Sequence, residues 1–188
     1  MRIGVDIDDT ISFTHKKLIE AALEYDENYV NGKGFKNKNG STFMEVFYWN
    51  VYNVDGFLHS IRNNKFYLDL EVKENANKYI TKLFNDGHEI YFITKRDNSF
   101  FTKMKTKKWL KKNGFKYNKL FIGIRNKSDI CEEHNIDLFI DNDYKNIEEA
   151  LAKGIDSLLM IDDFNKERKD LKSVKNWKEI YDYINGVK

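Results

Sequence analysis

The first residues that could do chemistry are carboxylates near the start of the chain. The apolar run 3–5 leads directly into Asp6, Asp8, Asp9 and Thr10. Carboxylates this close together at the end of a strand repel one another unless a cation lies among them. The pattern therefore favours a hard divalent metal such as Mg²⁺, which prefers oxygen ligands. A helix cap would explain Asp9 or Thr10, but not Asp6 and Asp8 as well.

A second strand-like run, residues 89–93, ends in a hydroxyl and two cations: Thr94, Lys95 and Arg96. A threonine hydroxyl and backbone N–H groups at a turn that leads into a helix can bind a phosphate. The alternative is a simple helix cap, made by Thr94 or Asp97, with both cations in solvent. This motif alone does not decide between the two.

A third apolar run, residues 137–140, ends in Asp141, Asn142 and Asp143. These side chains form a second oxygen-rich group suited to the same metal. The alternative is a turn followed by a helix N-cap, a role that suits Asp143. Lys127 stands in a loop that enters a predicted helix, and it matters for function only if it points into the same crevice.

The elements that must position these groups alternate between strand and helix. Short, continuous apolar runs predict strands buried on both faces, and helical patterns separate the later strands. This alternation predicts an α/β fold with a parallel sheet and helices on both faces. The predicted strands are residues 2–5, 89–93, 119–124, 137–140 and 157–161, and the predicted helices are 72–85, 100–113, 128–134, 144–153 and 177–184.

Residues 12–75 show no convincing strand pattern and are predicted to form a helical insertion. Loops that follow the first strand face the ligand crevice of an open α/β sheet. Phe13, Phe47 and Trp49 are therefore candidates for a substrate pocket, although aromatic residues at helical spacing more often form a core. We divide the chain into a core domain, residues 1–11 and 76–188, and a cap insertion, residues 12–75.

The composition excludes several classes of protein. The 188 residues include 32 Lys and Arg and 30 Asp and Glu, a net charge of +2 that argues against a general nucleic-acid binder. The lysines of the predicted helix 100–113 are expected to form a solvated basic face. The single cysteine, Cys131, fits a reducing cytoplasm. No run approaches the roughly 20 apolar residues of a membrane span, so no membrane association is expected.

Together, the motifs resemble those of the haloacid dehalogenase (HAD) superfamily of phosphohydrolases. Within it, the segments 4–10, 92–96 and 127–141 are most similar to the cytosolic 5′(3′)-deoxyribonucleotidases and to the bacterial nucleotidases grouped with them. The motifs occur in the family's order, each at a strand end, and the resemblance covers most of the chain. It implies a Rossmann-like parallel sheet of order 3-2-1-4-5, with a small helical cap inserted after strand 1.

The resemblance also implies roles for the carboxylates. Asp6 would be the nucleophile that forms an aspartyl-phosphate, and Asp8 would be the general acid and base. Mg²⁺ would be bound by Asp6, the main-chain carbonyl of Asp8 and Asn142. The fourth family motif often has two aspartates, so a neutral amide at Asn142 is a departure that could weaken metal binding. Asp143 could replace Asn142 as a ligand if the loop shifted by one residue.

The remaining motif residues would bind the phosphoryl group. The resemblance assigns Thr94 and Lys127 to the phosphate oxygens, with Lys95 contributing its backbone more than its side chain. Asp141 would orient Lys127 or lie just outside the metal's ligands, as would Asp143. The implied partner is a small-molecule phosphomonoester.

Four functions remain open at this point. The leading hypothesis is an Mg²⁺-dependent phosphomonoester hydrolase that acts on (deoxy)nucleoside monophosphates as a 5′-nucleotidase. The same chemistry could instead serve a sugar phosphate, a polynucleotide end or a phosphoprotein. A nucleotide-binding protein with weakened catalysis is the third hypothesis, and only Asn142 supports it. The fourth and least favoured is a nucleic-acid-binding protein that uses the lysine-rich helix 100–113, which would bind DNA with a steep dependence on salt.

Overall fold

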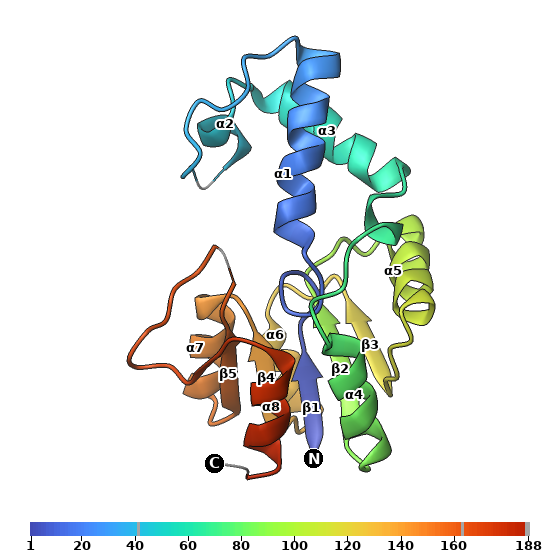
Figure 1. Ribbon diagram of the computed structural model, residues 1–188, viewed down its shortest axis with the longest axis vertical. Coiled ribbons are helices and arrows are strands. Elements are labelled where there is room, and N and C mark those ends of the chain that lie inside the picture. Colours follow the sequence, from blue (N-terminus) through green and yellow to red (C-terminus); the bar gives the residue numbers. More distant parts are fainter. Residues whose placement is uncertain (41, 163, 187–188) are drawn as a thin grey trace.

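A parallel β-sheet with helices around it makes up the lower part of the molecule as drawn in Figure 1. The computed structural model describes residues 1–40, 42–162 and 164–186. Within these residues the sheet has six strands in the order β3-β2-β1-β4-β5-β6. The strands are β1 (Arg2–Val5), β2 (Glu89–Thr94), β3 (Lys119–Ile122), β4 (Leu138–Asp141), β5 (Asp156–Met160) and β6 (Ser173–Val174).

The predicted strand order is confirmed and extended by one strand. β1 pairs with β2 on one side and with β4 on the other, both in parallel. These central strands are continuously apolar because both faces of the sheet are covered, and Ile3, Val5 and Phe92 are fully buried. β6 was not predicted, since its two residues, which pair with Leu159 and Met160 of β5, are too few to leave an apolar pattern.

Helices cover both faces of the sheet, as the alternating pattern predicts. Apolar residues of α4, α5 and α8 pack with Ile3 and Val5 on one face, and those of α6 and α7 pack with Phe139 on the other. The predicted helix 72–85 begins later, at Ala76, because Asn75 has a left-handed backbone (φ 59°). The helices are α4 (Ala76–Asn85), α5 (Phe100–Lys112), α6 (Lys127–Glu133), α7 (Tyr144–Ala152) and α8 (Trp177–Ile184).

A helical insertion separates β1 from β2 and stands beyond the carboxyl ends of the strands (Figure 1). Its elements are α1 (Thr14–Tyr25), the π-helical turn η1 (Asp26–Val30), α2 (Phe43–Val46), α3 (Val51–Asn63) and the 3₁₀ turn η2 (Phe66–Leu68). The boundaries of this insertion as a separate domain, residues 12–75, remain a prediction. No helix in the described part of the chain is long and apolar enough to cross a membrane.

Helix α5 holds the segment through which the chain returns from the insertion. The Lys105 ammonium donates to the carbonyl oxygens of Asn64 (2.7 Å) and Arg62, and the indole N–H of Trp109 donates to that of Leu70 (2.8 Å). The prediction of a solvated lysine face is therefore wrong at Lys105, which is 8% exposed. Its ammonium replaces water as the partner of carbonyls at the end of α3, which the helix itself leaves unpaired.

Candidate active site

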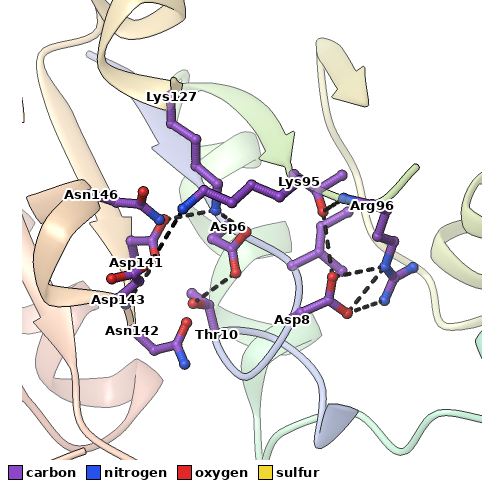
Figure 2. A network of polar contacts seen from close by, with 12 residues as sticks. Asp6, Asp8, Thr10, Lys95, Arg96, Lys127, Asp141, Asn142, Asp143 and Asn146 are labelled. Carbon is purple, nitrogen blue, oxygen red and sulfur yellow. Dashed lines mark hydrogen bonds and ion pairs between the residues drawn. The ribbon is translucent and has the colours of Figure 1, made fainter. Parts of the chain in front are cut away.

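The polar strand ends meet at one edge of the sheet. Asp6 follows β1, Thr94 ends β2, and Asn142 follows β4. Because β1 lies between β2 and β4, its carboxyl end is flanked by both of the other motifs. Lys127, the first residue of α6, reaches the same place, and Figure 2 shows Asp6, Lys127 and Asn142 around one centre. This is where an open parallel sheet binds its ligands.

Lys127 is buried between two carboxylates. Its ammonium contacts Asp6 Oδ1 and lies 2.8 Å from Asp141 Oδ2 (Figure 2). Asp141 also accepts hydrogen bonds from the Asn146 amide (2.9 Å) and from the backbone N–H of Asp143 (2.9 Å). Asp141 is therefore engaged in orienting the lysine, whereas Asp6 Oδ2, among the residues that the structure describes, accepts only a long hydrogen bond of 3.4 Å from the Thr10 hydroxyl. Asp6 keeps one oxygen available for chemistry.

The charges of this buried pair are set by burial and by the neighbouring groups. Burial raises the pKa of the Asp6 carboxyl to about 7, and the charges of Asp141 and Asp8 add to that shift while Lys127 opposes it. Burial alone would lower the pKa of Lys127, but Asp141 and Asp6 outweigh it and raise that pKa. Lys127 therefore stays cationic, and a divalent cation beside Asp6 would favour the ionised carboxylate.

Arg96 binds the second carboxylate of the motif. Its Nε and Nη2 donate to the two oxygens of Asp8 at 3.0 and 2.7 Å, the bidentate geometry of a strong ion pair. The Thr14 hydroxyl, at the start of α1, donates to Asp8 Oδ1 at 2.7 Å. The guanidinium carbon lies 4.6 Å from the centre of the Tyr67 ring, which belongs to the insertion. Arg96 thus joins β2, the Asp8 loop and the insertion.

This pairing reverses the effect of burial on Asp8. Burial would raise the pKa of the Asp8 carboxyl, but Arg96, with help from Thr14, outweighs it and lowers that pKa. Sequence reasoning assigned Arg96 no firm role. A cation two residues after the motif hydroxyl was the available signal, but the sequence does not reveal which carboxylate it reaches.

The other predicted phosphate-binding residues lie beside this cluster. Thr94 is fully buried, and its hydroxyl lies 3.4 Å from Asp8 Oδ2 and accepts from the backbone N–H of Arg96 at 3.2 Å. The Lys95 ammonium extends to Asp143 Oδ2, 3.1 Å away, so it bridges the ends of β2 and β4 (Figure 2). Asp143 also caps α7 by accepting from the backbone N–H of Lys145, as its alternative interpretation predicts.

The oxygen donors at this edge fit a hard cation. Asn142 donates its amide nitrogen to Asp162 Oδ2 at 2.9 Å, and Figure 2 shows its oxygen turned toward Thr10 and Asp6. In the described ranges, no three His, Cys, Asp or Glu side chains form a metal cluster by themselves. A cation would therefore be bound by few protein oxygens and by water, which is the habit of Mg²⁺.

The candidate substrate-pocket aromatics divide into two groups. Phe47 (0% exposed) and Trp49 (6% exposed) are packed inside the insertion, with ring centres 4.7 Å apart, and the Trp49 indole donates to the buried Asp26. The structure thus places this pair in the core of the insertion, the alternative that the spacing had left open. Phe13 instead lines a cavity of about 260 Å³ together with Asp162.

Comparison with known proteins places this geometry in a family. The sequence profile of the family described as "5' nucleotidase, deoxy (Pyrimidine), cytosolic type C protein" matches residues 1–188. The chain belongs to this family. Nucleotidase CA_C3379 of Clostridium acetobutylicum is 27% identical over 126 residues, which cover 65% of this chain and 64% of that protein. The matched region is thus less than two thirds of that relative's length.

Solved structures support the same fold. The haloacid dehalogenase-like hydrolase SP0104 of Streptococcus pneumoniae superposes with a TM-score of 0.72 at 14% identity, covering 97% of each chain. YfnB of Bacillus subtilis, described as a HAD-hydrolase bound to magnesium, superposes with a TM-score of 0.67 at 14% identity, covering 98% of each chain. These likenesses establish the fold. With the family match, they make this nucleotidase-family chain a HAD-type phosphatase.

Proposed function

We propose that this phosphatase hydrolyses (deoxy)nucleoside monophosphates with Mg²⁺, through an aspartyl-phosphate on Asp6. The observation that carries the proposal is the convergence of Asp6, Lys127 and Asn142 at the carboxyl ends of β1 and β4. A buried ammonium beside a carboxylate with one available oxygen suits a nucleophile that must approach an anionic phosphate. The nucleotidase family supports the substrate class.

In the first step, a carboxylate oxygen of Asp6 attacks phosphorus, the bond from phosphorus to the leaving oxygen breaks, and Asp8 gives that oxygen a proton. In the second step, water attacks the phosphorus of the aspartyl-phosphate, Asp8 takes the proton of water, and phosphate leaves with Asp6 restored. Lys127 and Thr94 hold the phosphoryl oxygens in line for both attacks. Mg²⁺, which Asp6 and Asn142 would hold, would supply positive charge that offsets the repulsion between Asp6 and the phosphate.

The ion pair with Arg96 limits when Asp8 can act as an acid. Arg96 favours the ionised carboxylate, so Asp8 must turn away from the guanidinium before it can give a proton to the leaving group. The contact between Arg96 and Tyr67 of η2 offers a physical link between this rotation and the insertion. We also assign the activity to the cytoplasm, on the strength of the single cysteine.

A panel of phosphomonoesters tests the proposal. Deoxynucleoside and ribonucleoside 5′-monophosphates, sugar phosphates and p-nitrophenyl phosphate are incubated with the wild type in Mg²⁺ or in EDTA, and released phosphate is measured. We expect hydrolysis of nucleoside monophosphates only with Mg²⁺, and a loss of at least about 10³-fold in Asp6→Asn. Asp182→Asn, which alters a surface carboxylate of α8, is the matched control. Absence of metal-dependent hydrolysis throughout the panel refutes the proposal.

A further inference from the structure

The side-chain amide of Asn142 has a fixed orientation. Its nitrogen donates to Asp162 Oδ2 at 2.9 Å, so its oxygen must face the opposite way. Figure 2 shows that this direction is toward Thr10 and Asp6. An amide can bind a cation only through its oxygen. The usefulness of Asn142 as a ligand therefore depends on which end of its amide Asp162 engages.

Asp162 is itself held by hydrogen bonds in the segment after β5. Its Oδ1 accepts from the backbone N–H groups of Phe164 (2.7 Å) and Asn165 (2.9 Å), and its own N–H donates to Asn165 Oδ1 (3.0 Å). Asn165 in turn donates to the carbonyl oxygens of Asn142 (2.8 Å) and Met160 (2.9 Å). With Oδ1 occupied by backbone donors, Asp162 presents Oδ2, an acceptor, to Asn142.

From this network we infer that Asp162 is a positioning residue for the metal site: it holds the Asn142 amide with its oxygen toward Asp6 and supplies the negative charge that Asn142 lacks. The inference rests on the proposed function. Where related motifs have a second aspartate, this chain has a neutral ligand with a carboxylate directly behind it. Groups that orient a metal ligand in this way typically change metal affinity by 10- to 100-fold when they are removed.

The hydrogen-bond pattern makes the effect of Asp162→Asn specific. The oxygen of the new amide at position 162 must remain with the two backbone N–H groups, so its NH₂ group faces the NH₂ group of Asn142. Two donors cannot pair, and the Asn142 amide must turn over to offer its oxygen to residue 162. Its NH₂ group then points at the metal position, where it cannot bind a cation.

The reciprocal exchange repairs the defect. In the double variant, which combines Asn142→Asp with Asp162→Asn, the NH₂ group at position 162 donates to one oxygen of the new carboxylate at position 142, and the other oxygen faces Asp6. Asn142→Asp alone instead sets two carboxylates against each other where a hydrogen bond of 2.9 Å now stands. This single variant should therefore melt at a lower temperature than wild type without metal, and the double variant should recover the loss.

Metal binding is measured without turnover, by titrating Mn²⁺ and following the free ion by electron paramagnetic resonance, with Mg²⁺ as competitor. We expect Asp162→Asn to raise the Kd for Mn²⁺ by at least about tenfold. The Kd of the double variant should lie within about threefold of the wild-type value. Asp170→Asn is the control, because Asp170 lies in the same segment but pairs with Arg168 at the surface.

A Kd for Asp162→Asn within about twofold of wild type would overturn the inference, as would a folded double variant that binds as weakly as Asp162→Asn. The double variant keeps the backbone contacts of residue 162, so if Asp162→Asn fails to fold, a folded double variant that binds Mn²⁺ at least about tenfold more weakly than wild type overturns the inference in its place. A wild-type chain that binds no Mn²⁺ would overturn both this inference and the Mg²⁺ part of the proposed function. Phosphate release by wild type that depends on Mg²⁺, with metal affinity unaffected by Asp162, would overturn this inference alone.

Discussion

Asp6 and Asp8 stand two residues apart at the end of the same strand, yet their surroundings differ in kind. On one side, Asp6 shares a buried lysine with Asp141, and its side chain is 5% exposed. On the other side, Asp8 forms a bidentate ion pair with the Arg96 guanidinium, and its side chain is 29% exposed. An ammonium is a point charge that leaves a carboxylate oxygen available, whereas a guanidinium occupies both oxygens. In the proposed mechanism, this choice of cation separates the nucleophile, Asp6, from the group that exchanges protons, Asp8.

Lys127→Met should have the largest effect, because it leaves Asp6 and Asp141 buried without their shared cation. Removing one partner from a buried ion network costs about 3–5 kcal/mol in the free energy of unfolding. Urea unfolding at pH 7 measures the loss, and phosphatase activity should disappear with it. Lys153→Met, which breaks surface ion pairs with Asp129 and Glu132, is the control and should lose much less. Equal losses in the two variants would remove the contrast between the buried site and the surface.

Arg96→Met should have a smaller effect on stability, about 1–3 kcal/mol, because Asp8 is partly exposed and water can replace the guanidinium. The folded chain holds the pKa of Asp8 below its ordinary 3.8, so this contribution is present above pH 3.8 and is lost as pH falls through the lowered value. The difference in the free energy of unfolding between wild type and Arg96→Met should therefore disappear in acid.

The same variant tests the role of Asp8. Without Arg96, burial dominates and the pKa of Asp8 rises, so the limb of the kcat/KM profile on which activity falls with rising pH should move to higher pH. An unchanged basic limb in Arg96→Met would show that Arg96 does not control the proton of Asp8. Arg96→Lys should keep the positive charge but not the bidentate contact with Asp8. Its kcat/KM profile should therefore lie between those of wild type and Arg96→Met.

Asp9 should contribute to the free energy of unfolding with the opposite dependence on pH to that of the ion pair between Asp8 and Arg96. Burial, together with the charges of Asp8 and Asp162, raises the pKa of Asp9 to about 6, although the backbone N–H of His15 opposes that shift. Its favourable contribution is thus complete below pH 3.8 and is lost as pH rises through 6. Asp9→Asn cannot ionise and tolerates the left-handed backbone of residue 9 (φ 58°).

We therefore expect Asp9→Asn to be more stable than wild type at pH 8 by about 1–2 kcal/mol, after allowing for the part of Asp9 that water reaches. The difference should vanish below about pH 4. Urea unfolding in metal-free buffer at pH 4, 6 and 8 measures it. A constant difference across this range would show that the ionisation of Asp9 is not its cause.

The smallest effect concerns Cys131, which lies in α6, the helix that begins at Lys127. Its thiol lies in α6, fully buried, and burial raises its pKa to about 12. The native chain should therefore react with a disulfide reagent at pH 8 only when it unfolds, since the thiolate is the reactive form. Lys127→Met should speed this reaction, and Arg96→Met should speed it less. Rapid labelling of the native chain would show that α6 opens without global unfolding.

Much of this architecture could be predicted from the sequence, for identifiable reasons. Buried parallel strands are continuously apolar, so the first five strands of the chain were predicted within one or two residues of their observed bounds. The short edge strand β6 left no comparable signal. Polar residues at strand ends could be assigned to one crevice because parallel strands end together.

Pairings between distant side chains could not be predicted in the same way. The partner of Arg96 depends on a contact between β2 and the loop after β1, and that of Asn142 depends on how the segment after β5 folds back. Phe47 and Trp49 had two plausible environments, because a helical spacing fixes which residues share a face but not what that face meets. Whether these two residues line a substrate pocket or form a core could be decided only from their positions in the structure.

The hydrogen bonds from Lys105 and Trp109 to the returning chain have a consequence for heat denaturation. If the insertion melted while the sheet stayed intact, the Lys105 ammonium and the Trp109 indole of α5 would lose their carbonyl acceptors. The hydrophobic cluster also runs unbroken from Ile3 of the sheet to Phe57 of the insertion. Unfolding either part alone is therefore unfavourable, so calorimetry should record a single cooperative endotherm instead of two.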